Sequence, residues 1–370
     1  MKGRLHHQLL WLAITLLVTV GLLASCTSLT PPSLPSTAPA APQSAPPKTE
    51  TPPFTTPGPP ALAPSPSPQP LPLRTGNFTL IRDIEYGKGG GTPLRLDIYM
   101  PKTPLSTPMP AVVWIHGGGW QGGDKYPTQA TTLANRGFFV ISINYRLSGV
   151  APFPAAIEDC KCAIRWLRAN AGKYNVDPDR IGVWGGSAGG HLSLLVGTAD
   201  ASAGLEGSGG WADYSSRVQA ICSFYGPSDF VSWYQDNARF GRTLSSAETK
   251  FLGGTMEQKP EVYKQASPVT WVSADDPPLL MVHGDRDQTV PIQQSQIMYD
   301  AYKALGLDAT LIKVVGAGHG FVNRHGQPPI SPSPQEIDQA VYEFFLKHLG
   351  EKATPAGGLS WQKIPTPDND

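Results

Sequence analysis

The sequence predicts an α/β fold with one mostly parallel β-sheet and helices on both of its faces. Short runs of β-branched and aromatic residues alternate with longer amphipathic runs between residues 74 and 350, which is the pattern of α/β domains. Glycine-rich segments directly follow two of the short apolar runs, where a strand gives way to a turn. We therefore expect one folded domain over residues 74–350.

Eight apolar runs are expected to form the strands of this sheet. They cover residues 78–86, 94–99, 111–115, 139–143, 181–184, 218–225, 279–282 and 310–315. Helices are expected between several of them, for example at residues 155–170 and 295–305, where apolar side chains recur with helical spacing.

The first 25 residues have the pattern of an export signal. Lys2 and Arg4 precede an apolar run over residues 9–24, which is shorter than the roughly 20 residues that a spanning helix needs. The segment ends in LASC at residues 23–26, which resembles the lipobox of bacterial lipoproteins. That resemblance implies cleavage before Cys26, a lipid anchor on this cysteine, and a place on a bacterial cell surface or in the periplasm. An ordinary secretory signal with a chance cysteine is the alternative.

Residues 26–73 are expected to be a disordered spacer. The stretch from residue 27 is almost entirely Pro, Ser, Thr and Ala, with Lys48 and Glu50 as its charged residues. Such a segment buries too little apolar surface to fold and favours an extended, polyproline-like chain of about 3.1 Å per residue. A second loose, proline-containing tail is expected over residues 351–370.

The charge balance argues against a nucleic-acid partner. The chain has 29 basic and 29 acidic side chains, so its net charge is zero and no field steers a polyanion to it. The sequence has no HExxH motif, no Cys/His pairs at zinc spacing and no Walker loop. We therefore expect neither a metal ion nor another cofactor.

Three cysteines remain besides Cys26. Cys160 and Cys162 lie two residues apart on an expected helix and point to different faces, so they cannot bridge each other without distortion. Cys222 falls in an expected buried strand. We expect all three to be free, buried thiols.

The segment GGSAG at residues 185–189 carries the main functional signal. It is a G-x-S-x-G motif that directly follows the expected strand 181–184 and opens an apolar, helical stretch over 191–196. A nucleophilic serine must stand on a sharp turn between strand and helix, and the glycines relieve the crowding there. The motif alone is short enough to occur by chance, so its context makes Ser187 the candidate nucleophile.

The segment HGGGW at residues 116–120 ends another expected strand. Its glycines leave backbone N–H groups accessible, and such groups stabilise the negative charge that develops on a carbonyl oxygen during acyl transfer. The N–H of Ala188, after the nucleophile, is expected to join them. A glycine-rich turn without such a role is the alternative.

A histidine should act as the base, and His319 is favoured over His325. His319 lies in the glycine-containing loop GAGHGF after the last expected strand. The other six histidines are set aside, because they are removed with the export signal or lie in expected strands, helices and motifs. They are His6, His7, His116, His191, His283 and His348.

The third member should be an acid between the serine and the histidine in chain order. The loop after the expected strand 279–282 offers Asp287, which is preferred, and Asp285, which is expected to cap a turn. Asp229, after the preceding strand, is the outside alternative. An acid in this position fixes the imidazole tautomer and stabilises its positive charge.

Together these segments resemble the α/β-hydrolase esterases. The segments are HGGGW, SINYRLS, GGSAGGHL, ASPVTWVSADDPPLLMVHGDRDQTVP and GAGHGF. They are most similar to the BD-FAE-like branch of bacterial acetyl xylan and feruloyl esterases, over essentially all of residues 74–350. The resemblance implies an α/β-hydrolase fold, Ser187 as nucleophile, His319 as general base and acid, Asp287 as its orienter, and Gly118, Gly119 and Ala188 as oxyanion donors.

One departure from related hormone-sensitive-lipase-like enzymes concerns the cap. About 40 residues separate the spacer from His116, and they read as strands, so a small cap or none is expected. A small lid would come from residues 198–216 or 228–267. The resulting open site suits a bulky sugar alcohol. Trp120 is expected either to stack on a sugar ring or to pack beneath the glycine loop.

The sequence thus predicts a serine carboxylic-ester hydrolase that works through an acyl-enzyme on acetyl or feruloyl esters of carbohydrates, or on other small esters. Two alternatives stay open. One is an arylformamidase-like amide hydrolase of the same fold, and the other is a noncatalytic lipoprotein that binds glycans.

Overall fold

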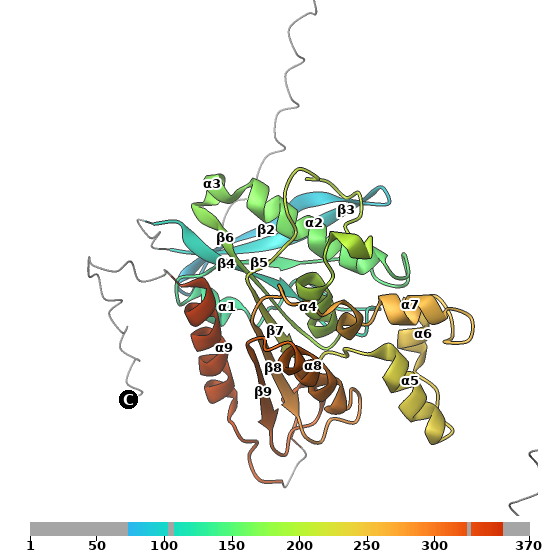
Figure 1. Cartoon of the computed structure of the whole chain (residues 1–370). Helices are drawn as coiled ribbons and strands as arrows, with labels where there is room; N and C mark the ends of the chain where they lie inside the picture. The colour runs from blue at the N-terminus through green and yellow to red at the C-terminus, as the bar shows by residue number, and fades with distance from the viewer. Residues whose placement is uncertain (1–72, 103–106, 324–326, 351–370) are drawn as a thin grey trace, which may run out of the picture. The chain divides into compact units, whose positions relative to one another are not determined.

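The computed structural model describes residues 73–102, 107–323 and 327–350 (Figure 1). The expected export signal, Cys26, the tail, His325 and all of the spacer except Leu73 lie outside these residues.

The described residues form a nine-stranded sheet in the order β1-β2-β3-β5-β4-β6-β7-β8-β9. The strands are β1 (Leu73–Thr75), β2 (Phe78–Gly89), β3 (Thr92–Pro101), β4 (Met109–Ile115), β5 (Phe139–Ile143), β6 (Val176–Gly186), β7 (Ala220–Phe224), β8 (Leu279–Gly284) and β9 (Ala309–Val314). The pairs from β1 through β3 to β5 are antiparallel, and all the others are parallel. The predicted mostly parallel sheet is confirmed, and β1 is a strand that the sequence did not indicate.

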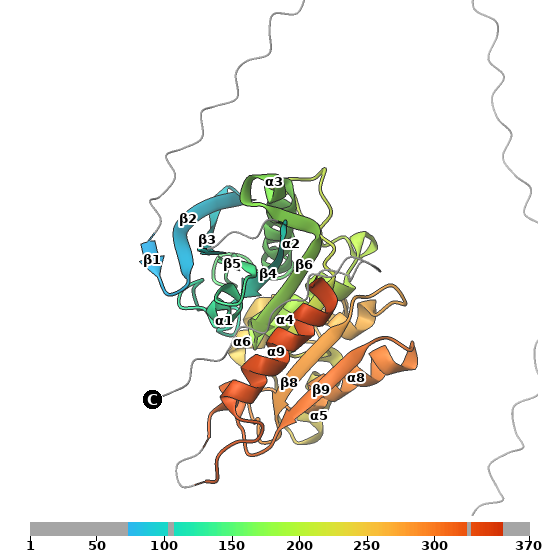
Figure 2. The same cartoon turned by 90° about the vertical axis from the view of Figure 1, so that its left-hand side faces the viewer.

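Helices cover both faces of this sheet. They are α1 (Thr131–Ala134), α2 (Ala155–Ala169), α3 (Ala171–Tyr174), α4 (Ala188–Thr198), α5 (Phe230–Arg239), α6 (Ser246–Leu252), α7 (Pro260–Gln265), α8 (Gln293–Ala304) and α9 (Pro334–Leu349). One core cluster joins α2, α4 and α8 to one face, and the other joins α1 and α9 to the opposite face. Figures 1 and 2 show α8 and α9 on opposite sides of β8 and β9.

The central strands explain why their sequences are continuously apolar. Every residue of β4, β5, β7 and β8 is buried. Parallel strands covered by helices on both faces have no solvent side, so the alternation of apolar and polar residues is lost. The parallel arrangement also brings the carboxyl ends of these strands to one edge, where the turns carry the candidate site residues.

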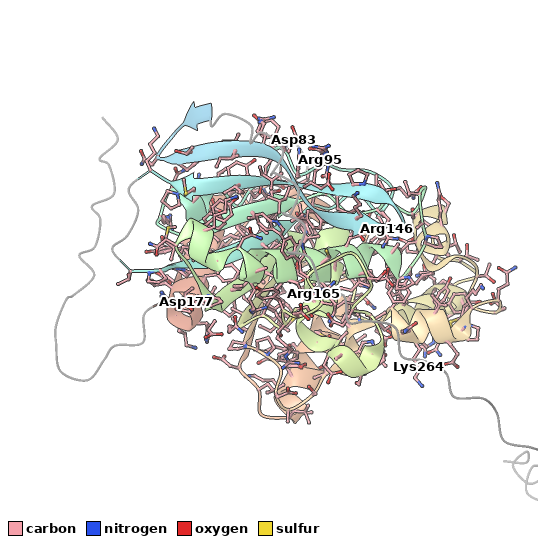
Figure 3. All side chains as sticks on the ribbon, turned by 90° about the horizontal axis from the view of Figure 1, so that it is seen from above. Asp83, Arg95, Arg146, Arg165, Asp177 and Lys264 are labelled. Atoms are coloured by element: carbon pink, nitrogen blue, oxygen red, sulfur yellow. The ribbon has the colours of Figure 1, made fainter. Side chains whose placement is uncertain are left out.

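Charged side chains fix helix α2 to the segments beside it (Figure 3). Arg146 lies 2.8 Å from Asp159 of α2, and Glu206 accepts from Lys161 at 2.6 Å and from Arg165 at 2.8 Å. Glu206 holds in place the segment 198–216, one of the two expected sources of a lid. This segment therefore packs along α2, and it also contacts β2, because the N–H of Lys88 donates to the carbonyl of Gly209 at 3.0 Å.

The three cysteines of the described residues are free and buried, as expected. Burial raises the pKa of the thiols of Cys160, Cys162 and Cys222, so each stays protonated and unreactive at neutral pH.

The other expected lid segment forms a small helical insertion. Helices α5, α6 and α7 lie between β7 and β8, and a Cβ built on Gly119 would be 3.5 Å from Cβ of Ala247 on α6. Residues 73–102 and 107–115 form strands and turns without a helix, so no cap precedes the glycine loop in this part of the chain. Among the described residues, no helix has the length and apolar character needed to cross a membrane.

We expect Gly189→Ala to destabilise the domain. A Cβ at this position would lie 2.0 Å from the carbonyl oxygen of Ile115 and 2.7 Å from that of His116, because the first turn of α4 presses on the end of β4. Overpacking of this kind costs about 1–3 kcal/mol in the free energy of unfolding, which urea denaturation measures.

Gly172→Ala is the matched control, because its Cβ would meet no atom within 4 Å and Gly172 lies in α3. It should leave the free energy of unfolding unchanged or raise it by about 0.5–1 kcal/mol. Equal stability of the two variants would contradict the close packing of α4 on β4.

Candidate active site

Ser187 stands on a strained turn between β6 and α4. Its backbone has φ +56° and ψ −120°, a conformation that costs a non-glycine residue about 1–3 kcal/mol. The turn is held from both sides, because the N–H of Ser187 donates to the carbonyl of Phe224 at 2.8 Å and its own carbonyl accepts from His191 at 2.9 Å. The expected serine turn is therefore present, and it lifts the Ser187 side chain away from the strand.

His319 follows β9 and opens the short helical turn η3 (His319–Phe321). Its Nε2 lies 2.9 Å from Oγ of Ser187, and its Nδ1 lies 2.7 Å from Oδ2 of Asp287. Since a carboxylate can only accept, the proton of the neutral imidazole is assigned to Nδ1, and Nε2 is left to accept from the serine hydroxyl. The ring side chain is 25% exposed, so the base is reachable from solvent.

Asp287 is the buried acid of this chain of hydrogen bonds. Its side chain is fully buried, and Oδ1 accepts from the N–H groups of Thr289 at 2.8 Å and Val290 at 3.0 Å. Burial alone would raise the pKa of Asp287, but hydrogen bonds from His283, His319 and the backbone hold this pKa well below its usual range. The carboxylate is thus charged at neutral pH.

The structure also shows the hydrogen bonds of Asp285 and Asp229, the two acids that were not preferred. Asp285 accepts from the N–H of Gly316 at 2.8 Å, which is the turn-capping role expected of it. Asp229 caps α5 by accepting from the N–H groups of Val231 and Ser232. Neither carboxylate contacts His319 in the structure.

The glycine loop lies directly against the serine turn. A Cβ on Gly117 would be 2.8 Å from the carbonyl oxygen of Gly186 and 3.4 Å from Cβ of Ser187. Gly118 and Gly119 have φ +108° and +58°, conformations that favour glycine. In the part of the chain that the structure describes, the N–H groups of Gly118, Gly119 and Ala188 donate to no partner, which leaves them available to an oxyanion.

Of the two alternatives for Trp120, the structure shows packing beneath the glycine loop. The side chain is only 3% exposed, and its ring stacks on Phe251 of α6 with centroids 4.4 Å apart. Its Nε1 donates to Nδ1 of His191 at 3.2 Å. A bulky apolar ring beside the helical insertion gains more from burial than from exposure at the site, so Trp120 packs beneath the loop.

Tyr225 is a site residue that the sequence analysis missed. It follows β7 with a positive φ of 40°, and its ring meets the His319 ring edge to face at 4.8 Å. Burial raises the pKa of Tyr225 to about 12, so its hydroxyl is neutral. The position of Tyr225 directly after a strand is the sole feature of the sequence that points to a site residue here. That feature does not indicate the contact of Tyr225 with His319.

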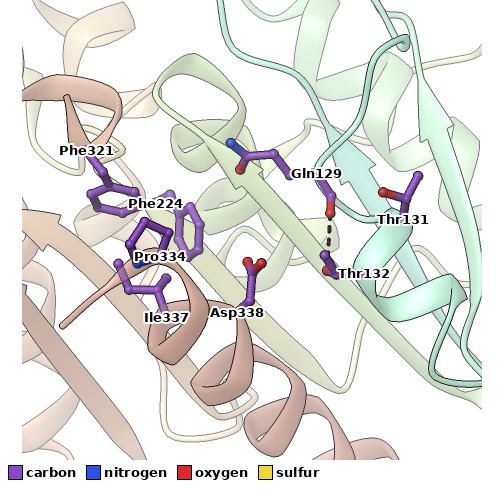
Figure 4. Close-up of a pocket in the computed structure, with 8 residues that line it drawn as sticks. All are labelled: Gln129, Thr131, Thr132, Phe224, Phe321, Pro334, Ile337 and Asp338. Atoms are coloured by element: carbon purple, nitrogen blue, oxygen red, sulfur yellow. Dashed lines mark hydrogen bonds between the residues drawn. The ribbon is translucent and has the colours of Figure 1, made fainter. Parts of the chain in front are cut away.

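A pocket of about 280 Å³ lies between α1, α9, the end of β7 and the segment after β9 (Figure 4), and Ser187, His319 and Asp287 are not among the residues that line it. Phe321, two residues after His319, and Phe224, whose carbonyl holds the Ser187 N–H, form its apolar wall. Gln129, Thr131, Thr132, Pro334, Ile337 and Asp338 complete the lining. Two aromatic rings thus lie opposite an amide, hydroxyls and a carboxylate in this lining.

The part of the chain that the structure describes has no cluster of three or more His, Cys, Asp or Glu side chains arranged to hold a metal ion. Ser187, His319, Asp287 and the loop N–H groups are the groups that the geometry above brings together.

Asp287→Asn should leave the serine almost unactivated. The asparagine amide favours the wrong imidazole tautomer, so Nε2 no longer accepts the serine proton, and we expect a loss of about 10³- to 10⁴-fold. The measurement is the rate at which a fluorophosphonate probe labels Ser187. Asp285→Asn is the matched control, because its Oδ1 still accepts from Gly316, and this variant should label at the normal rate. Equal rates in both variants would exclude Asp287 as the orienting acid.

Comparison with known proteins finds esterases that are similar to this chain. A family model described as BD-FAE matches residues 96–302. The chain is 34% identical over 236 residues to the esterase LipC of Mycobacterium tuberculosis, an alignment that covers 61% of this chain and 56% of LipC. The chain spans 56–64% of the lengths of the mycobacterial relatives that it matches.

Two solved structures share the fold. The truncated form of a carbohydrate esterase from gut microbiota is 30% identical with a TM-score of 0.64, covering 77% of this chain and 100% of that one. A bifunctional GH43-CE of Bacteroides eggerthii is 32% identical with a TM-score of 0.63, covering 73% of this chain and 38% of that one. The chain belongs to the BD-FAE family and has the α/β-hydrolase fold.

Proposed function

We propose that this protein is a serine carboxylic-ester hydrolase that removes short acyl groups such as acetyl, or feruloyl groups, from carbohydrate esters or other small esters. The observation that carries the proposal is the hydrogen-bonded series Ser187–His319–Asp287, with distances of 2.9 Å and 2.7 Å, beside N–H groups that have no partner in the described chain. Family membership and the esterase relatives support the reaction class.

The first half of the reaction forms an acyl-enzyme. Oγ of Ser187 adds to the ester carbonyl carbon while Nε2 of His319 takes the hydroxyl proton. The carbonyl oxygen becomes an oxyanion, which the N–H groups of Gly118, Gly119 and Ala188 stabilise. A single donor of this kind contributes about 3–4 kcal/mol to transition-state stabilisation. The carbon–oxygen bond to the alcohol then breaks, and His319 gives the proton to the leaving oxygen.

The second half restores the enzyme. His319 takes a proton from water as the water oxygen adds to the acyl carbon, and the oxyanion forms again at the same N–H groups. When this intermediate collapses, the bond to Oγ breaks and His319 returns the proton to Ser187. The products are one carboxylic acid and one alcohol, and Asp287 stays ionised throughout.

Two observations support a carbohydrate as the alcohol. Two solved structures similar to this chain are named a carbohydrate esterase and a GH43-CE. The pocket that Phe321 lines, two residues along the chain from His319, combines the partly exposed ring of Phe321 with the polar groups of Gln129 and Asp338. Aromatic rings pack on the apolar faces of sugars, and carboxylates and amides hydrogen-bond sugar hydroxyls.

The ester test uses the full chain on p-nitrophenyl esters of increasing acyl length. We expect turnover that is highest for short chains, and a loss of about 10⁶-fold in Ser187→Ala, since the nucleophile is removed. Ser202→Ala, on the exposed turn after α4, is the control and should keep full activity. Turnover that survives in Ser187→Ala, or no turnover on any ester, would overturn the proposal, and cleavage of aryl formamides instead would favour an amide hydrolase.

The same protein on acetylated xylan and on feruloylated arabinoxylan tests the substrate class. Release of acetate or ferulate that depends on Ser187 is the expected outcome. Binding of these glycans without any serine-dependent release would instead favour a noncatalytic glycan-binding protein.

We also propose that the chain is exported and anchored to a bacterial membrane through Cys26. The support is the sequence alone, with basic residues, an apolar run and LASC at residues 23–26. Cys26→Ala should move the protein from the membrane fraction to the soluble fraction, because the lipid attachment site is lost. Ser36→Ala, in the expected spacer, should stay in the membrane fraction. Retention of Cys26→Ala with the membranes would contradict the anchor.

A further inference from the structure

A second histidine lies on the far side of the buried acid. His283 ends β8 next to Gly284, and its side chain is fully buried. Its Nε2 lies 2.9 Å from the carbonyl oxygen of Val290 and 3.4 Å from Oδ2 of Asp287. Oδ2 is the same oxygen that accepts the hydrogen bond from Nδ1 of His319. His283 makes no contact with the serine, so the mechanism above leaves this buried imidazole without a role.

The partners of His283 fix its tautomer. The carbonyl of Val290 can only accept, which assigns a proton to Nε2. Nδ1 is then the acceptor for the hydroxyl of Ser295 on α8, 2.7 Å away and itself buried. Donation to Nδ1 polarises the ring and strengthens Nε2–H as a donor. The imidazole therefore joins three separate elements: the end of β8, the turn that carries Asp287, and α8.

We propose that His283 is a positioning residue for the reaction, which holds Oδ2 of Asp287 in line with His319 and sets the negative charge on that oxygen. The inference rests on the proposed function. The turn between Gly284 and Val290 has to keep a charged carboxylate buried, and His283 contacts both Val290, at its end, and Asp287, at its centre. The Nε2–H dipole draws charge away from Oδ2, so it moderates how strongly Asp287 stabilises the protonated form of His319.

Three titratable groups contact His283 or its neighbour Asp287. Titratable groups that face His283 are Asp287, His319 beyond it, and Tyr225, whose ring centroid is 6.5 Å away. Asp285, on the same turn, instead accepts from the N–H of Gly316. Burial raises the pKa of Tyr225 to about 12, so it stays neutral in an esterase assay. Ser295, from α8, does not titrate. A change in pH dependence on altering His283 is therefore transmitted through Asp287 and His319.

The test measures kcat and KM for p-nitrophenyl acetate against pH in His283→Phe, His283→Gln and Ser295→Ala. His283→Phe should lower kcat about 10- to 100-fold with KM unchanged, because the buried ring touches no substrate. The low-pH limb of its kcat/KM profile should move to higher pH, since an unmoderated Asp287 stabilises protonated His319 more strongly. His283→Gln restores an N–H donor and should recover most of kcat and the normal limb.

Ser295→Ala keeps the ring and weakens its Nε2–H, so a smaller shift in the same direction is expected. This variant decides the matter if His283→Phe does not fold. A folded His283→Phe or Ser295→Ala with the wild-type pH profile would overturn the positioning role. Retained turnover in Ser187→Ala would contradict the proposed function. That result does not depend on His283, so the two proposals can fail independently.

Discussion

The close approach of helix α4 to the end of strand β4 is the constraint on which the rest of the site depends. Gly189 permits it, because any Cβ there would overlap the carbonyl oxygen of Ile115. The approach forces Ser187 into a turn with positive φ and brings the glycine loop after β4 against the serine. Since β4 and β6 are adjacent and parallel, the nucleophile and the oxyanion donors emerge side by side from one edge of the sheet.

Burial of the acid links this edge to the other half of the sheet. A buried carboxylate is costly unless hydrogen bonds compensate for its lost hydration. Asp287 receives two backbone N–H groups on one oxygen and His319, with His283 nearby, on the other. The acid is thereby rigid and charged, which holds the imidazole in the tautomer that can accept a proton from Ser187.

The helical insertion is coupled to the oxyanion loop through aromatic packing. Trp120 directly follows the loop glycines, stacks on Phe251 of α6 and donates to His191 of α4. Burial lowers the pKa of His191 to about 4, so the ring stays neutral and its Nδ1 keeps accepting from Trp120 at neutral pH. Helix α6 therefore supports the loop, and a movement of the insertion would change the oxyanion site as well as access to it.

The sequence by itself determined the strands and the backbone turns. Central strands buried on both faces must be continuously apolar, and the glycines at 117–119 and 185–189 are required wherever the chain packs this closely, so both features are visible locally. Chain order and loop position also selected Asp287 and His319. Only the tertiary structure decided the orientation of Trp120, the contact of Tyr225 with His319 and the place of His283 behind Asp287. These contacts join elements far apart in the chain, and side-chain partners of that kind exist only after the sheet and helices have packed together.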